Sequence, residues 1–167
     1  ICIGLIGWHE FSYKNDQNVS AKIKEFKQQG IDYIIVYPHW GVEYKNKPNQ
    51  KQVKLAHKWL DEGADIIIGS HPHVAQSIEK YKDKYIFYSL GNFIFDQMFS
   101  DETRNGLGIR LSFVDKKIVK VELLPVLIED YAQPHSISPR EATSTMQRLQ
   151  QLYNMQIVDG VEVGVLK

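Results

Sequence analysis

Two stretches decide the fold. Residues 33–39 read YIIVYPH, and residues 64–73 read ADIIIGSHPH. Each contains a short apolar run, Tyr33–Tyr37 and Asp65–Ile68, that leads directly into histidine, and the segment between them has the length of one helical crossover. A right-handed crossover makes such strands parallel, with their carboxyl ends at one sheet edge. Open α/β sheets bind ligands at that edge, so we expect the histidines there to form a site.

Three imidazoles at one edge favour a metal site, with His39, His71 and His73 as ligands. His71 and His73 are two residues apart, so in extended backbone both rings project to the same side. Pro72 restricts its own backbone and favours an extended conformation at His71. The alternative is a loop whose histidines only form hydrogen bonds, with His39 a satisfied buried residue.

Two further residues near these histidines are candidates for chemistry. Glu43 lies four residues beyond His39 and fits a metal ligand, a partner that orients an imidazole, an acid/base group, or a solvated loop carboxylate. Asn92 follows a strand and Gly91, and fits either substrate binding or a side-chain turn. His9 ends the first apolar run, but its spacing carries no signature, so a structural role is favoured there.

Along the rest of the chain, the pattern of apolar residues predicts a β-α-β-α-β arrangement in the first half of the chain and mostly antiparallel strands in the second half. Helical faces and turn signals fix the order, with Gly30 and Gly63 as helix ends. The order predicts one α/β domain with mixed sheets and helices outside. The elements expected after the first strand are a helix through Val19, Ile23 and Phe26, a helix after Pro48, hairpins Gln76–Tyr81/Lys84–Ser89 and Leu107–Val114/Ile118–Leu124, and a closing helix Pro139–Tyr153.

Composition narrows the function classes. The chain has 167 residues, 20 lysines plus arginines and 20 aspartates plus glutamates, hence zero formal charge. A neutral chain offers no general field for nucleic acid, so we expect no nucleic-acid partner. No apolar stretch is long enough to span a bilayer, and no signal peptide is visible. The opening run Ile1–Gly7 resembles a buried strand already in progress, so we expect further residues upstream. In the isolated chain we expect an exposed apolar surface or an unpaired strand edge, either of which favours self-association.

Three sequence blocks together resemble the CapA family of bacterial capsule and poly-γ-glutamate biosynthesis proteins. They are PHWGVEY at 38–44, GADIIIGSHPH at 63–73 and YSLGNF at 88–93. That family is related in fold to calcineurin-like metallophosphoesterases. The resemblance implies a layered α/β sandwich of mixed sheets with flanking helices, of which residues 1–167 form the C-terminal portion of a single domain.

The resemblance also implies a two-metal centre with divalent Mn, Fe or Zn. By motif position His39, His71 and His73 are metal ligands, while Glu43 and Asn92 match prominent positions that we assign to catalysis. The sequence departs from the pattern in two respects. The first ligands of the superfamily precede residue 1, and residue 70 is serine where relatives often carry histidine. Three histidines without bridging carboxylates should therefore bind metal weakly.

Two classes of function remain open. In the first, the protein is a metal-dependent hydrolase of a phosphoester or amide bond in capsule or poly-γ-glutamate synthesis, acting on an anionic polymer or phosphorylated envelope substrate. In the second, it is a non-catalytic scaffold or polymer-binding subunit of a capsule assembly complex. By the resemblance, both place the protein in the cell envelope or outside the cytoplasm, with a membrane-associated synthesis complex as partner.

Overall fold

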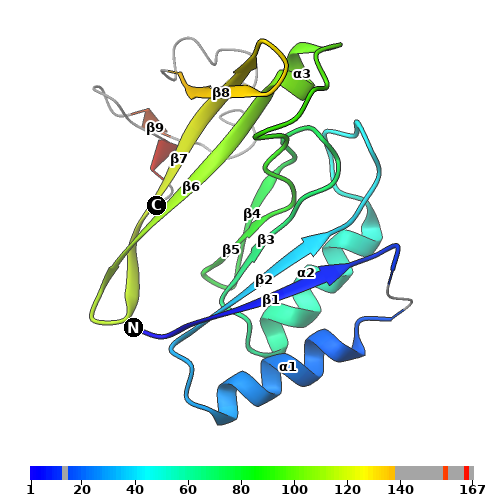
Figure 1. Cartoon of the computed structure of the whole chain (residues 1–167). Helices are drawn as coiled ribbons and strands as arrows, with labels where there is room; N and C mark the ends of the chain where they lie inside the picture. Colours follow the sequence, from blue (N-terminus) through cyan, green and yellow to red (C-terminus); the bar gives the residue numbers. More distant parts are fainter. Residues whose placement is uncertain (13–14, 138–155, 158–163, 166–167) are drawn as a thin grey trace. The chain divides into compact units, whose positions relative to one another are not determined.

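The structure is a computed structural model that describes residues 1–12, 15–137, 156–157 and 164–165 (Figure 1). Its residues fall into two compact units. The first comprises Ile1–Pro72 and Gln76–Ser89; the second comprises His73–Ala75 and the chain from Leu90 onward. The predicted closing helix Pro139–Tyr153 lies outside the described residues.

The first unit is built on a five-stranded mixed sheet. Its order is β1-β2-β3-β5-β4, and β1, β2 and β3 are parallel, as the crossover rule predicts. The hairpin β4–β5 is antiparallel, as predicted, but β5 also pairs in parallel with β3, which was not predicted. The strands are β1 (Ile3–His9), β2 (Tyr33–His39), β3 (Ile66–Ile68), β4 (Ile78–Tyr81) and β5 (Lys84–Phe87).

Two helices cover one face of this sheet, α1 (Gln17–Gln28) and α2 (Gln50–Glu62) (Figure 1). Asn49 caps α2, because its side chain accepts from the Gln52 N–H while the Gln52 side chain accepts from the Asn49 N–H. Gly63 ends α2 in the left-handed region with φ 119°. Both helices therefore lie where the sequence placed them.

The core of the first unit lies between the helices and the sheet. Burial alternates along β1 and β2, as expected for strands with one covered face. Three tryptophans form its centre: Trp59 of α2 packs edge-on against Trp8 of β1 and stacks on Trp40 just after β2, with ring centroids 5.4 and 5.7 Å apart. The Trp40 indole N–H also donates to the Tyr88 carbonyl over 2.9 Å, which satisfies its polar atom in the core.

The strand β1 forms one edge of this sheet. Its outward positions are apolar and exposed: Leu5 retains 65% of its accessible surface, and Ile3 is exposed as well. The predicted exposed strand edge is therefore present within the described residues, whereas self-association remains a prediction.

The second unit contains a long antiparallel hairpin, β6 (Asn105–Val114) and β7 (Lys117–Glu129), as predicted. A short helix, α3 (Asp101–Arg104), precedes it. The strand β7 also pairs with β8 (Gln133–Ser136) and with β10 (Gly164–Val165), which in turn pairs with β9 (Gln156–Ile157). The described residues thus form an α/β protein with one mixed and one antiparallel sheet.

Candidate metal centre

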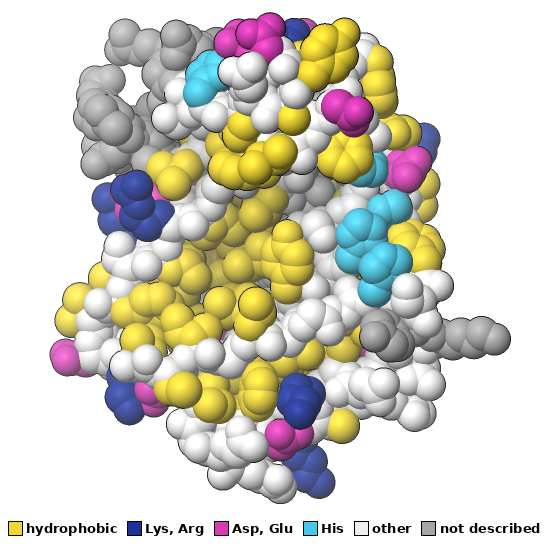
Figure 2. Space-filling model, in the orientation of Figure 1, with side chains coloured by type: hydrophobic (Ala, Val, Ile, Leu, Met, Phe, Trp, Pro, Cys, Tyr) yellow, Lys and Arg dark blue, Asp and Glu magenta, His cyan; other side chains and the backbone are white. Residues whose placement is uncertain are grey.

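Histidines line the carboxyl edge of the three parallel strands. His9 and His39 end β1 and β2 and are paired in register, and His39 also forms an isolated bridge with Ser70, next to His71. The rings of His9 and His39 stack with centroids 4.5 Å apart, and those of His39 and His71 lie 4.6 Å apart, tilted by 50°. Figure 2 shows histidine side chains, in cyan, grouped at the surface. The predicted convergence of His39 and His71 on one edge is present in the structure.

The segment from His71 to His73 differs from the extended conformation that the sequence predicted. His71 has φ 102° and His73 has φ 62°, both in the region that L-residues rarely adopt. Pro72 does not enforce an extended backbone at His71, so that prediction was wrong. Surrounding contacts hold the turn instead: the Pro72 carbonyl accepts from the Tyr44 N–H over 2.8 Å. Strained backbone of this kind is concentrated at functional sites.

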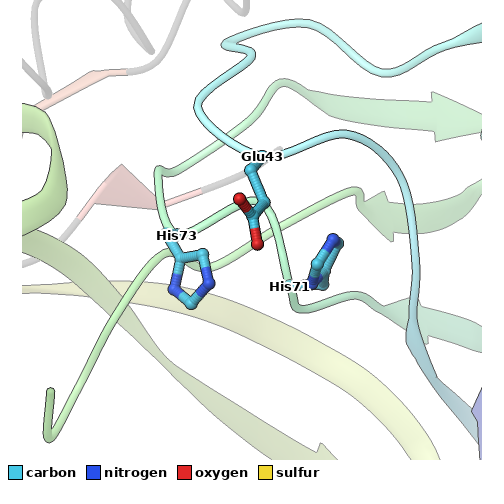
Figure 3. A group of neighbouring side chains, drawn as sticks. All are labelled: Glu43, His71 and His73. Atoms are coloured by element: carbon cyan, nitrogen blue, oxygen red, sulfur yellow. The ribbon is translucent and has the colours of Figure 1, made fainter.

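Glu43 supplies a carboxylate beside these histidines (Figure 3). It lies in the loop between β2 and α2, and one potential ligand atom from each of Glu43, His71 and His73 lies within 4.8 Å of the others. Glu43 is exposed, whereas both histidines are partly buried. The group therefore differs from the predicted ligand set: it contains Glu43 and omits His39, although the His39 ring neighbours that of His71.

Asn92 is the hydrogen-bond partner of His73. Its Oδ1 lies 2.9 Å from His73 Nδ1, while its Nδ2 donates to the Thr103 carbonyl and the Gln97 side chain. The Thr103 carbonyl can only accept, so the amide nitrogen of Asn92 faces it and Oδ1 faces His73. Nδ1 of His73 therefore carries the proton, and Nε2 is the nitrogen with the lone pair that a metal would need. Asn92 is buried. The structure thus places this residue as an orienting partner of His73.

His9 is the residue at this edge that sequence reasoning underrated. Its Nδ1 is buried and has no hydrogen-bond partner among the described residues. Phe11 packs edge-on against the rings of both His9 and His71, so it contributes an apolar wall. One signal could have identified His9: two neighbouring parallel strands, β1 and β2, both end in histidine at paired positions.

The donor set fits a divalent transition metal. Two imidazoles and one carboxylate are the ligands of many catalytic zinc and non-haem iron sites, which keep positions open for water or substrate. The assigned tautomer of His73 and its hydrogen bond to Asn92 match the outer partner that metal-bound histidines normally have. The residues present therefore fit such an ion, which Glu43, His71 and His73 would hold.

Groups with a shifted pKa lie elsewhere in the first unit. Burial and the nearby Asp65 carboxylate raise the pKa of Tyr33 to about 12. Burial is the largest single effect on Asp16 and would raise its pKa, but the hydrogen bond with Lys58, the other hydrogen bonds of the carboxylate and the charge of Lys58 together lower that pKa. The raised pKa of Tyr33 means that its neutral form stabilises the fold below pH 10.0, and that this contribution is lost as pH rises through about 12.

The chain belongs to a family of bacterial capsule synthesis proteins. Residues 6–97 match the family described as "Bacterial capsule synthesis protein PGA_cap", and this range includes the histidine edge, Glu43 and Asn92. The resemblance seen in the three sequence blocks is confirmed at the level of the family.

Individual relatives carry names of the same kind. The chain is 39% identical over 128 residues to the capsule biosynthesis protein CapA of Bacillus anthracis, covering 77% of this chain and 29% of the relative. It is 43% identical over 108 residues to the PGA biosynthesis protein CapA of Bacillus subtilis, covering 65% and 28%. A probable polyglutamine synthesis accessory protein of Mycobacterium tuberculosis is 30% identical over 121 residues, covering 72% and 29%. The matched part of the chain thus spans less than a third of the length of these relatives.

Proposed function

We propose that this chain forms part of the metal centre of a hydrolase that acts in the synthesis of a capsule or poly-γ-glutamate polymer. The observation that carries the proposal is the group Glu43, His71 and His73, with Asn92 fixing the tautomer of His73. A bound divalent metal supplies a Lewis acid and a hydroxide nucleophile near neutral pH. Mn, Fe and Zn all accept this donor set, so the identity of the metal stays open.

Each residue has a distinct part in the proposal. His71 and His73 hold the ion through neutral imidazole nitrogens, and the Glu43 carboxylate offsets part of its charge. Asn92 orients His73 and keeps its proton on Nδ1. His39 lies beside His71 and is the proposed ligand of the second ion that the family resemblance implies. Ligands from elsewhere in the full-length protein would complete the coordination.

The names of the relatives support both the proposed polymer substrate and the proposed cellular location. The proposed substrate is an anionic envelope polymer or its phosphorylated precursor, cleaved at an amide or phosphoester bond, and the proposed location is the cell envelope. Among the helices that the structure describes, none is long and apolar enough to cross a membrane.

One observation favours a second function. The Mycobacterium relative is named an accessory protein, so a non-catalytic subunit that binds the growing polymer in an assembly complex is the alternative. The two differ in one measurable respect. A catalytic centre loses activity when Glu43 is replaced, whereas a binding subunit keeps its function.

The test combines metal content with activity in the full-length protein. We expect His71→Ala and His73→Ala to lose bound metal, measured by elemental analysis, while the fold is kept. His57→Ala is the matched control, because His57 lies on α2 and pairs with Glu79 over 2.7 Å, outside the metal group. Wild-type metal content in both His71→Ala and His73→Ala would refute the metal centre. Metal loss with unchanged polymer synthesis would favour the accessory function.

A further inference from the structure

Two buried glutamines lie beneath the loop that carries Glu43. Gln52 of α2 and Gln76, just before β4, retain 1% of their accessible surface each. Buried amides are uncommon, because each unsatisfied polar atom is costly. The hydrogen bonds of this pair therefore need an explanation.

The two side chains form one continuous chain of hydrogen bonds with a fixed direction. Gln52 accepts from the Asn49 N–H over 2.9 Å and donates its Nε2 to Oε1 of Gln76 over 2.9 Å. Gln76 Nε2 then donates to the carbonyls of Lys45 and Lys47, over 2.8 and 3.2 Å. Because both carbonyls can only accept, the orientation of each amide is determined.

This chain of bonds fixes the loop from Gly41 to Asn49. The two glutamines bind two carbonyls of the loop and the N–H of Asn49 at the end of the loop. Contacts of Gly41 hold the beginning of the loop. Gly41 has φ 92°, and a Cβ at this position would lie 2.8 Å from the Gln52 side chain. The Gly41 N–H donates to the Glu10 carboxylate over 2.8 Å. Glu43 lies between these fixed points.

We infer that Gln52 and Gln76, called here the glutamine pair, are positioning residues that set the place of the Glu43 carboxylate through the loop 41–49. The inference rests on the proposed metal centre for its effect on metal binding. Its structural part, the fixing of the loop, stands independently. Loss of outer-shell partners of this kind typically lowers metal affinity about 10–100-fold.

The test uses Gln76→Met, which keeps an unbranched side chain but removes both donors to the loop. Cobalt(II) is the probe, because its absorption spectrum reports bound ligands, and full-length protein is titrated. We expect affinity to fall about 10–100-fold. In a Glu43→Gln background, Gln76→Met should cause no further loss, because both changes remove the same interaction.

Two controls separate positioning from general stability. Ile23→Val removes a methyl group from a fully buried position of α1 far along the chain from the loop, and it should leave cobalt affinity unchanged. Gln50→Met changes an exposed glutamine of α2 and should likewise have no effect. Equal losses of affinity in Gln76→Met and Ile23→Val, or losses that multiply in the double variant, would overturn the inference.

Amide hydrogen exchange provides a readout that does not depend on metal. In Gln76→Met, exchange at the Gly41 and Tyr44 amides should accelerate while the amides of β2 stay protected. Gln52→Glu should act in the same direction, since it keeps an acceptor for Asn49 but loses the donor to Gln76, and it replaces Gln76→Met if that variant does not fold. A wild-type protein that binds no cobalt refutes the metal centre alone. Unchanged exchange in the loop refutes the role of the glutamine pair.

Discussion

Replacing His71 by glycine should stabilise the metal-free protein relative to His71→Ala. His71 has φ 102°, and holding an L-residue in such a conformation costs about 1–2 kcal/mol, which glycine avoids. Glycine gains about 0.4–1 kcal/mol of freedom in the unfolded chain, which offsets part of the relief. The net gain over alanine is therefore about 0.5–1 kcal/mol, or roughly 1–4 °C in Tm for a chain of this size.

Comparing His71→Gly with His71→Ala isolates the effect of the backbone conformation at residue 71 on stability. Both remove the imidazole, its packing against His39 and Phe11, and its capacity to bind metal. Thermal unfolding followed by circular dichroism in the presence of a chelator is the assay. His57 provides the reverse control: it lies inside α2, so His57→Gly should be less stable than His57→Ala by about 1 kcal/mol. If His71→Gly melts at or below His71→Ala, the backbone of His71 is not strained and the reasoning fails.

Three further outcomes are expected. Stability should fall as pH rises from 10.0 through about 12, and Tyr33→Phe should flatten this fall in denaturant titrations; an identical pH profile in the variant would contradict the assignment. Asn92→Leu should lower metal affinity about 10–100-fold by freeing the His73 ring, measured by isothermal titration; wild-type affinity would show that Asn92 does not orient His73. Leu5→Lys should reduce self-association of the isolated chain in light scattering, and equal scattering would place the contact away from β1.

The parallel arrangement of β1, β2 and β3 could be predicted because each follows from a local pattern plus the handedness of a crossover. The placement of β5 beside β3 could not. The segments 76–81 and 84–89 contain a complete hairpin signal, which is satisfied whichever sheet the hairpin joins. The parallel partner of β5 lies earlier in the chain, in β3, and depends on which edge remains open after folding.

The candidate site likewise has features that could be predicted from the sequence and features that could not. His39 and His71 could be placed at one edge because strand ends determine where the following residues lie. The backbone of His71 and His73 could not be predicted, because tertiary contacts overrode the local preference that Pro72 imposes. The glutamine pair was missed for a different reason. A glutamine normally lies at the solvated surface, and its burial depends on partners far along the chain.

The pairing of β5 with β3 also determines when the candidate centre can form during folding. The Gly69 N–H donates to the carbonyl of Phe87, the last residue of β5, over 2.7 Å, and the Gln76 N–H donates to the Ser89 carbonyl over 3.0 Å. The segment with both histidines is therefore held at one end by β5 and at the other by the chain just after it. The backbone bonds at both ends of this segment form only once β5 lies beside β3. Interactions that form after the rate-limiting step slow unfolding and leave the folding rate unchanged. If the docking follows the rate-limiting step of folding, a metal bound here extends the lifetime of the native state without acting as a template for it.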